Sequence, residues 1–331
     1  MEAIVFRQNG QVGVEHIADP RPGPGEVLVR VRASGICHTD LEILRGNYGA
    51  SAFPLVPGHE YSGEVIETGP GVTGFAVGDR VVVDPNIGCG TCPGCRAGRV
   101  NLCTDLGAYG VTLNGGFAEA CVVRAGALVP MPAISHHMAA LAEPMGCVLN
   151  GLSPLEGRGI DHALIFGAGP MGLLMGIALG IRGAGRVTMV DLNEDRLVMA
   201  ESFGLGGVIS GSGALAGLRQ SCDLVVDATG IPAVAGGLVD YTANGGSVLY
   251  FGVCPQSARI EISPFELFRR QLSLFGTHSL SHRDIPEALK VIAAFGPGIE
   301  ALVTHRLSMA EIAAIMAGGA PKNSMKVHMT V

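Results

Sequence analysis

The segment GAGPMG, from Gly167 to Gly172, restricts the possible folds of this chain more than any other part of the sequence. The preceding letters, HALIF, are typical of a buried strand, and residues 171–182 have the pattern of a helix. In the spacing G-x-G-x-x-G at such a junction, the first glycine allows a tight turn, and the second lets the backbone approach a pyrophosphate closely. The third lets the helix pack tightly against the strand. The pattern therefore predicts a dinucleotide site at the start of the helix. The residues expected there are Gly167, Gly169, Pro170, Met171 and Gly172.

The pattern around this motif predicts an α/β domain. From about Asp161 onward, apolar strand-like stretches alternate with helix-like ones, which favours a parallel sheet with helices on both faces. The further strands are expected within 186–192, 222–230, 245–252 and 272–279, and a further helix within 194–204. The tail from Ile285 on has helix-like stretches around 287–295 and 310–317.

Asp191 is the candidate residue that binds the ribose hydroxyls of the cofactor. It ends the strand after the glycine motif, about 20 residues further on, as dinucleotide sites require. Its carboxylate would accept hydrogen bonds from the ribose hydroxyls and repel a 2′-phosphate, so NAD is favoured over NADP. Arg196 would instead favour NADP, since an arginine can bind the 2′-phosphate.

The first half of the chain has a different pattern. Short alternating stretches separated by glycine and proline, such as Glu26–Ala33, Gly63–Gly69 and Asp79–Pro85, predict an antiparallel, barrel-like β domain. With 331 residues the chain has the length of about two domains.

Four of the nine cysteines lie within fifteen positions, spaced C-x2-C-x2-C-x7-C. Such spacing lets thiolates converge on one tetrahedral ion, and four protein ligands close its coordination shell. A structural zinc is the favoured interpretation, with an iron–sulfur cluster or free thiols as alternatives. The ligands would be Cys89, Cys92, Cys95 and Cys103.

Three further residues suggest a second, open metal site. Cys37 lies in GICHTD, His59 in PGHE and Glu143 in AEPMG. Each alone is more often an ordinary core or hydrogen-bonding residue. Together with a dinucleotide motif, mixed sulfur, nitrogen and oxygen ligands are what a Lewis-acid zinc needs.

Composition excludes several classes of protein. Hydrophobic residues make up 48% and charged residues 15%, which excludes a disordered chain. The net charge of -7 argues against a nucleic-acid partner. The uncharged stretch 163–181 fits a strand, turn and helix better than a membrane span, and no signal peptide is evident. We therefore expect a soluble, cytoplasmic protein with no membrane partner.

The motifs together resemble the zinc-dependent medium-chain dehydrogenase/reductase family. GICHTD, PGHEYSGEVIETGPGVTGFAVGDRV, the four-cysteine segment, GAGPMG and VDLNEDR occur in family order over nearly the whole chain. The resemblance implies a GroES-like catalytic domain (1–150), a Rossmann domain (151–284) and a C-terminal segment (285–331) that returns to the first. It also implies a catalytic zinc at Cys37 and His59.

The resemblance further points to the sorbitol- and polyol-dehydrogenase-like subgroup. That subgroup has a Glu-Pro pair where Glu143 and Pro144 stand, and a glutamate after the ligand histidine, as Glu60 is here. It implies that Glu60 and Glu143 share the metal, directly or through water; which one binds it directly stays open, and Glu60 is alternatively an outer carboxylate. The family gives Thr39 the role of a proton relay and places Arg196 beside the adenosine, although Thr39 is alternatively a turn-capping residue.

We therefore expect an enzyme with two zinc ions that oxidises a secondary alcohol of a polyol, sugar or cyclitol with NAD. A simple secondary-alcohol or diol dehydrogenase is the alternative, and a non-catalytic NAD-binding protein the remote one. Tyr48 and Phe53 are candidate substrate-pocket residues or ordinary packing. A homodimer or homotetramer is expected. The pattern identifies neither the particular substrate, nor the stereochemistry, nor the direction of reaction.

Overall fold

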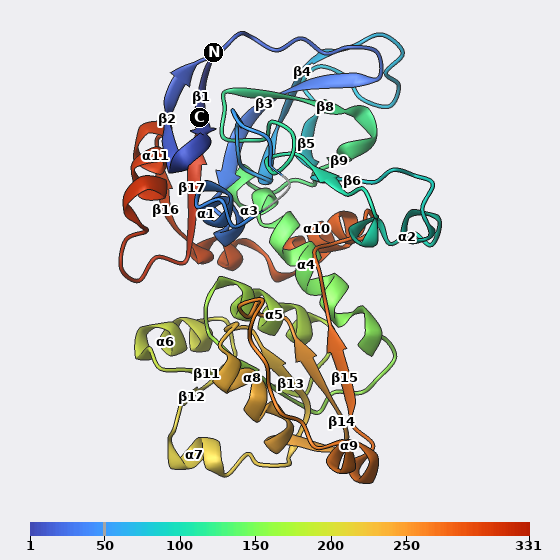
Figure 1. The fold of residues 1–331 in the computed structure, drawn as a ribbon, viewed down its shortest axis with the longest axis vertical. Helices are drawn as coiled ribbons and strands as arrows, with labels where there is room; N and C mark the ends of the chain where they lie inside the picture. Colours follow the sequence, from blue (N-terminus) through green and yellow to red (C-terminus); the bar gives the residue numbers. More distant parts are fainter. Residues whose placement is uncertain (49–50) are drawn as a thin grey trace. The chain divides into compact units, whose positions relative to one another are not determined.

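The computed structural model describes residues 1–48 and 51–331, and it divides into two compact units (Figure 1). The first unit consists of Met1–Gly146 and Leu280–Val331, and the second of Cys147–Ser279. The chain thus leaves the first unit once and returns to it.

The second unit is built on a six-stranded parallel sheet in the order β12-β11-β10-β13-β14-β15. This order, with the first strand in the middle, is that of a dinucleotide-binding Rossmann sheet. All five residues of the central strand β10 are buried, as its apolar sequence predicts. The strands are β10 (His162–Phe166), β11 (Arg186–Asp191), β12 (Gly206–Ile209), β13 (Cys222–Asp227), β14 (Thr242–Tyr250) and β15 (Ser273–Gly276).

Helices connect these strands and pack on the sheet. α5 contacts β10 and β11, and α6 contacts β11 and β12. The helices are α5 (Pro170–Ile181), α6 (Glu194–Ser202), α7 (Gly213–Ala216), α8 (Pro232–Gly237) and α9 (Pro264–Arg270). The predicted α/β fold is therefore confirmed, and the uncharged stretch 163–181 is a strand and a helix. Among the described residues, no helix is long and apolar enough to span a membrane.

The first unit has a seven-stranded, mainly antiparallel sheet around β3, which pairs with β4, β8 and β17. Its core includes Val29, Tyr61 and Phe117, all fully buried. The strands are β1 (Glu2–Arg7), β2 (Gln11–His16), β3 (Glu26–Gly35), β4 (Glu60–Thr68), β5 (Arg80–Val83), β6 (Asn86–Ile87), β7 (Gly107–Ala108), β8 (Ala120–Arg124), β9 (Leu128–Pro130), β16 (Val303–Leu307) and β17 (Lys326–Thr330). The predicted β-rich character of this half is confirmed.

Two helices of the first unit pack on its strands: α3 (His136–Ala140) contacts β3 and β4, and α11 (Met309–Gly318) contacts β1, β2 and β17. Figure 1 shows the segment around α2 extending away from the strands. The helices are α1 (His38–Leu44), α2 (Pro93–Arg96), α3 (His136–Ala140), α10 (Asp284–Phe295) and α11 (Met309–Gly318), and α4 (Ala142–Leu152) begins in this unit. Because β17 pairs with β3, the end of the chain lies beside residues that precede α1.

Candidate active site and cofactor site

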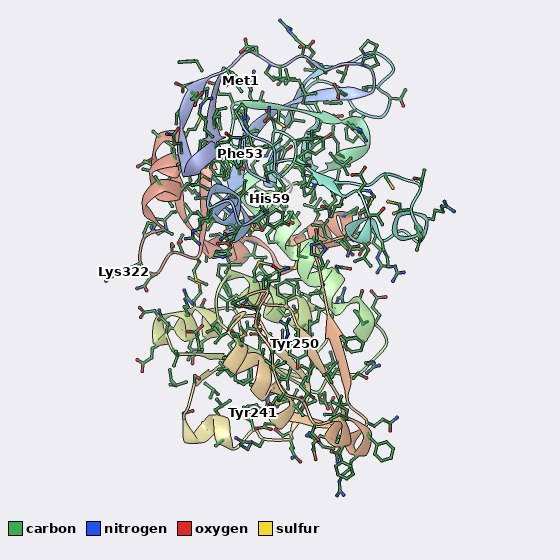
Figure 2. The ribbon with its side chains drawn as sticks, viewed as in Figure 1. Met1, Phe53, His59, Tyr241, Tyr250 and Lys322 are labelled. Atoms are coloured by element: carbon green, nitrogen blue, oxygen red, sulfur yellow. The ribbon has the colours of Figure 1, made fainter. Side chains whose placement is uncertain are left out.

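Three candidate metal ligands come together in the first unit. Cys37 immediately precedes α1, and His59 immediately precedes β4, whose first residue is Glu60. One possible ligand atom from each lies within 4.8 Å of the other two. His59, labelled in Figure 2, and Glu60 are almost fully buried. A thiolate, an imidazole and a carboxylate at this spacing fit a zinc ion.

Asp40 contacts two of these candidate ligands, Cys37 and His59. Its Oδ2 accepts a hydrogen bond from the backbone amide of Cys37 at 2.8 Å, and its Oδ1 lies 3.5 Å from Nδ1 of His59. Burial opposes a charge on His59, but the negative charges of Cys37 and Asp40 outweigh it and raise the pKa of His59 well above its usual value. Negative charge is thus concentrated where a cation would bind, and Asp40 orients the imidazole for it.

Glu60 forms a buried ion pair with Lys326, at the start of β17. The ammonium nitrogen lies 2.5 Å from Oε1 of Glu60 and also contacts Oε2, and both side chains are at most 5% exposed. Burial lowers the pKa of Lys326, but the negative charges of Glu60, Cys37 and Glu143 outweigh it, so the pKa is raised. The lysine is therefore a fixed cation beside the candidate metal site.

The other predicted residues lie around this group rather than in it. Glu143, in the first turn of α4, is 7% exposed and close enough to stabilise the charge on Lys326, but its carboxylate is not among the ligand atoms within 4.8 Å of one another. Thr39 is half-buried in the first turn of α1. Tyr48 is 41% exposed, whereas Phe53, labelled in Figure 2, packs against the core.

The four clustered cysteines form a second group of possible metal ligands. Their sulfur atoms lie within 4.8 Å of one another, and none is in a disulfide. Backbone amides point at the sulfurs: Cys89 donates to Cys103, Cys92 to Cys89 and Cys95 to Cys92, at 3.2–3.4 Å. Hydrogen bonds from Thr91 lower the pKa of Cys89 to about 6. Amide donors stabilise thiolates, so this loop fits a four-thiolate zinc site.

The glycine motif forms the turn that its sequence predicts. Gly167 has φ +102°, a conformation that favours glycine, and a side chain on Gly172 would collide with the carbonyl oxygen of Gly167. A Cβ on Gly169 would meet nothing within 4 Å, so the turn is open there. Pro170 and Met171 are the first residues of α5, which places a helix N-terminus at the open turn. This geometry fits a bound pyrophosphate.

Asp191, at the end of β11, lies beside this turn. Its Oδ2 accepts a hydrogen bond from the amide of Ala168 at 2.8 Å, and NH1 of Arg196 lies 3.8 Å from the same oxygen. The guanidinium of Arg196 is partly exposed. An acid and a base therefore lie together where the adenosine ribose would be bound.

Comparison with known proteins agrees with both units. Residues 23–133 match the model of the alcohol dehydrogenase GroES-like domain, and residues 170–294 match that of the zinc-binding dehydrogenase family. A D-altritol 5-dehydrogenase of Agrobacterium fabrum is 50% identical over 316 residues, which cover 94% of each protein. The chain belongs to the zinc-dependent medium-chain dehydrogenase/reductase family. It is an oxidoreductase of the alcohol and polyol dehydrogenase type.

Solved members of the family have the same fold. A Sinorhizobium meliloti protein bound to NADP is 30% identical, with a TM-score of 0.93 over 100% of this chain and 99% of that one. An alcohol dehydrogenase of Escherichia coli CFT073 complexed with NADH is 28% identical, with a TM-score of 0.89 over the same shares. Both of these solved relatives are thus bound to a nicotinamide cofactor.

The structure adds one residue to this dehydrogenase site that the sequence analysis missed. Lys326 contacts Glu60 across 266 positions of sequence, through strands that meet only in the folded chain. Its neighbours in sequence, MKVHMTV, look like an ordinary strand. Asp40 was visible beside Cys37, but only the fold brings it to His59.

Proposed function

We propose that this dehydrogenase transfers a hydride from a secondary alcohol of a polyol, sugar or cyclitol to NAD, giving the ketone. The observation that carries the proposal is the donor set: one thiolate, one imidazole and the carboxylate of Glu60, with the carboxylate of Glu143 nearby, in place of a second thiolate. Carboxylates are harder ligands than thiolates and are compatible with oxygen donors around the metal. The similarity to a D-altritol dehydrogenase makes acyclic polyols the first substrates to test.

The residues of the site divide the work among them. When bound, a zinc ion held by Cys37 and His59 together with Glu60 or Glu143, directly or through water, would supply a Lewis acid that makes the alcohol more acidic, and the nicotinamide would accept the hydride. Thr39 takes up the proton of the substrate hydroxyl. Asp40 keeps the imidazole of His59 in place, and Glu60 accepts a hydrogen bond from a neighbouring hydroxyl of the substrate.

NAD is the cofactor we propose, rather than NADP. The carboxylate of Asp191 is held by the backbone of the glycine turn, where it would accept the ribose hydroxyls and repel a 2′-phosphate. Arg196 lies beside this carboxylate and would flank the adenosine of the cofactor. Because a solved relative binds NADP, both cofactors belong in the test.

The remaining assignments complete the proposal. A second zinc, bound by the four clustered cysteines, is structural, which gives two per chain. Residues 1–150 with 285–331 carry the metal chemistry, and 151–284 bind the cofactor. The enzyme is a homodimer or homotetramer, and it works in the cytoplasm, where reducing conditions keep the ligand thiols free.

A reduction screen tests the function. Purified enzyme is incubated with linear polyols, cyclitols, simple secondary alcohols and diols, each with NAD and with NADP, and the absorbance of the reduced cofactor is followed. We expect the highest kcat/KM with a polyol and NAD. Best turnover of a simple secondary alcohol or diol would favour the alternative substrate class, and a preference for NADP would overturn the cofactor assignment.

A further inference from the structure

The acid that ends β13, Asp227, is fully buried in the second unit and binds the backbone that follows it. Oδ1 of Asp227 accepts hydrogen bonds from the amide and the hydroxyl of Thr229, at 2.8 and 2.6 Å. The amide of Gly230 lies 3.3 Å from each of the two carboxylate oxygens. Hydrogen bonds of this kind make a buried carboxylate tolerable. The carboxylate therefore fixes the turn that follows β13.

The loop after β14 is tied to the same residue. The backbone carbonyl oxygen of Asp227 accepts hydrogen bonds from the amides of Phe251 and Gly252, at 3.0 and 2.8 Å. A Cβ on Gly252 would collide with the amide of Gly230 and lie 3.0 Å from Oδ2 of Asp227, so the two loops are in close contact. Asp227 and Tyr250 are register partners, which places both loops at the carboxyl edge of the sheet.

The loop after β13 also packs against the glycine turn. A Cβ on Gly167 would lie 3.0 Å from Cγ2 of Thr229, and the amide of Ala228 donates to the carbonyl oxygen of Phe166 at 2.8 Å. On the other side of β10, Asp191 accepts a hydrogen bond from the backbone of the same turn. An acid thus ends each of the two strands that flank β10, and both acids help to hold the glycine turn.

The position of these loops in the sheet connects them with the cofactor. In a doubly wound sheet the dinucleotide lies outside the carboxyl ends of the strands, at the point where the strand order reverses. That point lies between β10 and β13, the strands that carry the glycine turn and Asp227 (Figure 1). The carboxylate of Asp227 is already engaged by backbone and by Thr229, so any effect on the cofactor passes through the loops that it holds.

We propose that Asp227 is a positioning residue for the nicotinamide cofactor, which fixes the loops after β13 and β14 in the conformation that receives the cofactor beside the glycine turn. The inference rests on the proposed function, because it concerns the dinucleotide site assigned there to the glycine turn and Asp191. Loops that are already ordered lose little freedom when the cofactor binds, and this preorganisation increases affinity. The charge of the carboxylate acts in the opposite direction, because it repels an anionic pyrophosphate.

The first test is cofactor binding by variants of Asp227. Dissociation constants for NADH and NADPH are measured by fluorescence titration of the wild type, Asp227→Asn and Asp227→Ala. We expect Asp227→Asn to bind the preferred cofactor about 5- to 50-fold more weakly, because its amide group turns a donor toward the amide of Gly230. Asp227→Ala removes every acceptor and should bind more weakly still. Unchanged binding would overturn the inference, and so would tighter binding, because repulsion by the charge would then outweigh the order of the loops.

Steady-state kinetics of Asp227→Asn provide a second measurement. The KM for the oxidised cofactor should rise by about the same factor as the dissociation constant, whereas kcat at saturating cofactor should change less than about threefold. A decrease in kcat alone, with KM unchanged, would mean that Asp227 acts on the chemical step and would overturn the inference.

Asp223→Asn is the matched control. Asp223 lies on the same strand as Asp227, and its Oδ2 also accepts hydrogen bonds from two backbone amides, those of Asp161 and His162, both at 2.9 Å. His162 begins β10, so these bonds lie at the amino end of the sheet, away from the glycine turn. Asp223→Asn should lower the melting temperature but leave the dissociation constant of the cofactor unchanged. An equal loss of cofactor affinity in both variants would reveal a general effect of stability and would overturn the inference.

Thr229→Val covers the case in which the variants of Asp227 do not fold. It removes the hydroxyl that donates to Asp227 and accepts from the amide of Ile231 at 3.0 Å, but it keeps the size of the side chain. We expect roughly 3- to 10-fold weaker cofactor binding, whereas Thr229→Ser keeps the hydroxyl and should bind like the wild type. Equal affinity in Thr229→Val and the wild type would overturn the inference.

The wild type is titrated first, because its result separates the inference from the proposed function. A wild type that binds neither NADH nor NADPH would overturn both together. A wild type that binds one of them, with Asp227 and Thr229 variants that bind it equally well, would overturn the inference alone.

Discussion

Asp191 is hydrogen-bonded to the backbone of Ala168, 23 residues before it in sequence. Oδ2 accepts from the amide of Ala168 at 2.8 Å, and Oδ1 accepts from the amide of Asn193 at 2.9 Å. The acid at the end of β11 therefore also fixes the glycine turn before α5. A substitution that removes the side-chain oxygens of Asp191 therefore changes both the ribose contact and the geometry of the turn.

Two substitutions at this position separate those effects. Asp191→Ala should raise the KM for NAD roughly 10- to 100-fold and narrow the preference against NADP, since it removes a charge-assisted acceptor and the repelling charge. Asp191→Asn keeps a carbonyl oxygen for the turn but loses the charge, so it should discriminate less yet bind NAD better than the alanine variant. Steady-state kinetics with both cofactors measure this. Unchanged KM values in both variants would contradict the assignment.

The local parts of the two sites were predictable, and the long-range parts were not. The glycine turn is set by neighbours: Gly172 is needed because of the carbonyl group of Gly167, five positions away, and the motif carries that requirement in its spacing. The cysteine loop was predictable for the same reason, because its four ligands lie within fifteen positions of sequence. Lys326 and Glu60, in contrast, meet only because β17 pairs with β3 and β3 with β4. No local pattern marks a lysine in such a strand as the partner of a glutamate.

The metal content of the protein follows from the two groups of ligands. Purified wild-type protein should contain about two zinc ions per chain, and Cys37→Ala about one. A chelator should remove the catalytic zinc first, because a site with an open position lets the chelator bind the ion. Activity should be lost before the thermal transition shifts. Elemental analysis with activity and melting measured on the same samples checks this, and full activity in metal-free protein would refute it.

The cysteine loop should contribute to folding rather than to turnover. Cys92→Ser removes one of four ligands of a closed site, and the folding energy that metal binding provides should fall by an amount on the order of a few kcal/mol. Thermal unfolding of this variant is compared with that of Cys254→Ser, which changes a cysteine outside both ligand groups. Normal stability with selectively lost kcat in Cys92→Ser would show that the loop has a catalytic role.

His136 should make the protein less stable in mild acid. Its imidazole lies half-buried between Ser62 and Arg80, and this partial burial, with the charge of Arg80, lowers the pKa of His136 to about 4. In the unfolded chain the pKa returns to about 6.5, so between these values only the unfolded chain takes up the proton. The free energy of unfolding therefore decreases as pH falls from about 6.5 to 4, by up to about 3 kcal/mol from this group.

The variant His136→Gln isolates that contribution. It keeps a polar side chain that cannot take up a proton, so its stability should fall less than that of the wild type over the same pH range. Denaturant unfolding at pH 7 and pH 4.5 measures the difference, and zinc loss in acid affects both proteins alike. An equal decrease in both proteins would mean that His136 is protonated in the folded state as readily as in the unfolded one.

The last prediction concerns the class of substrate. Glu60, held beside the candidate zinc site by Lys326, offers a buried carboxylate to a hydroxyl next to the reacting alcohol. Such a charge-assisted hydrogen bond contributes about 1–3 kcal/mol to transition-state binding, which corresponds to a roughly five- to 150-fold gain in kcat/KM. A polyol should therefore be oxidised more efficiently than its deoxy analogue lacking the adjacent hydroxyl.

Steady-state kinetics on matched pairs measures the ratio of kcat/KM for the polyol to kcat/KM for its deoxy analogue. The double variant Glu60→Gln/Lys326→Met keeps the pocket near neutral and should reduce this ratio toward one, compared with the wild type. Equal or better efficiency with the deoxy compounds in the wild type would remove the basis for a polyol substrate, but it would leave zinc-dependent alcohol oxidation in place, because that rests on Cys37 and His59.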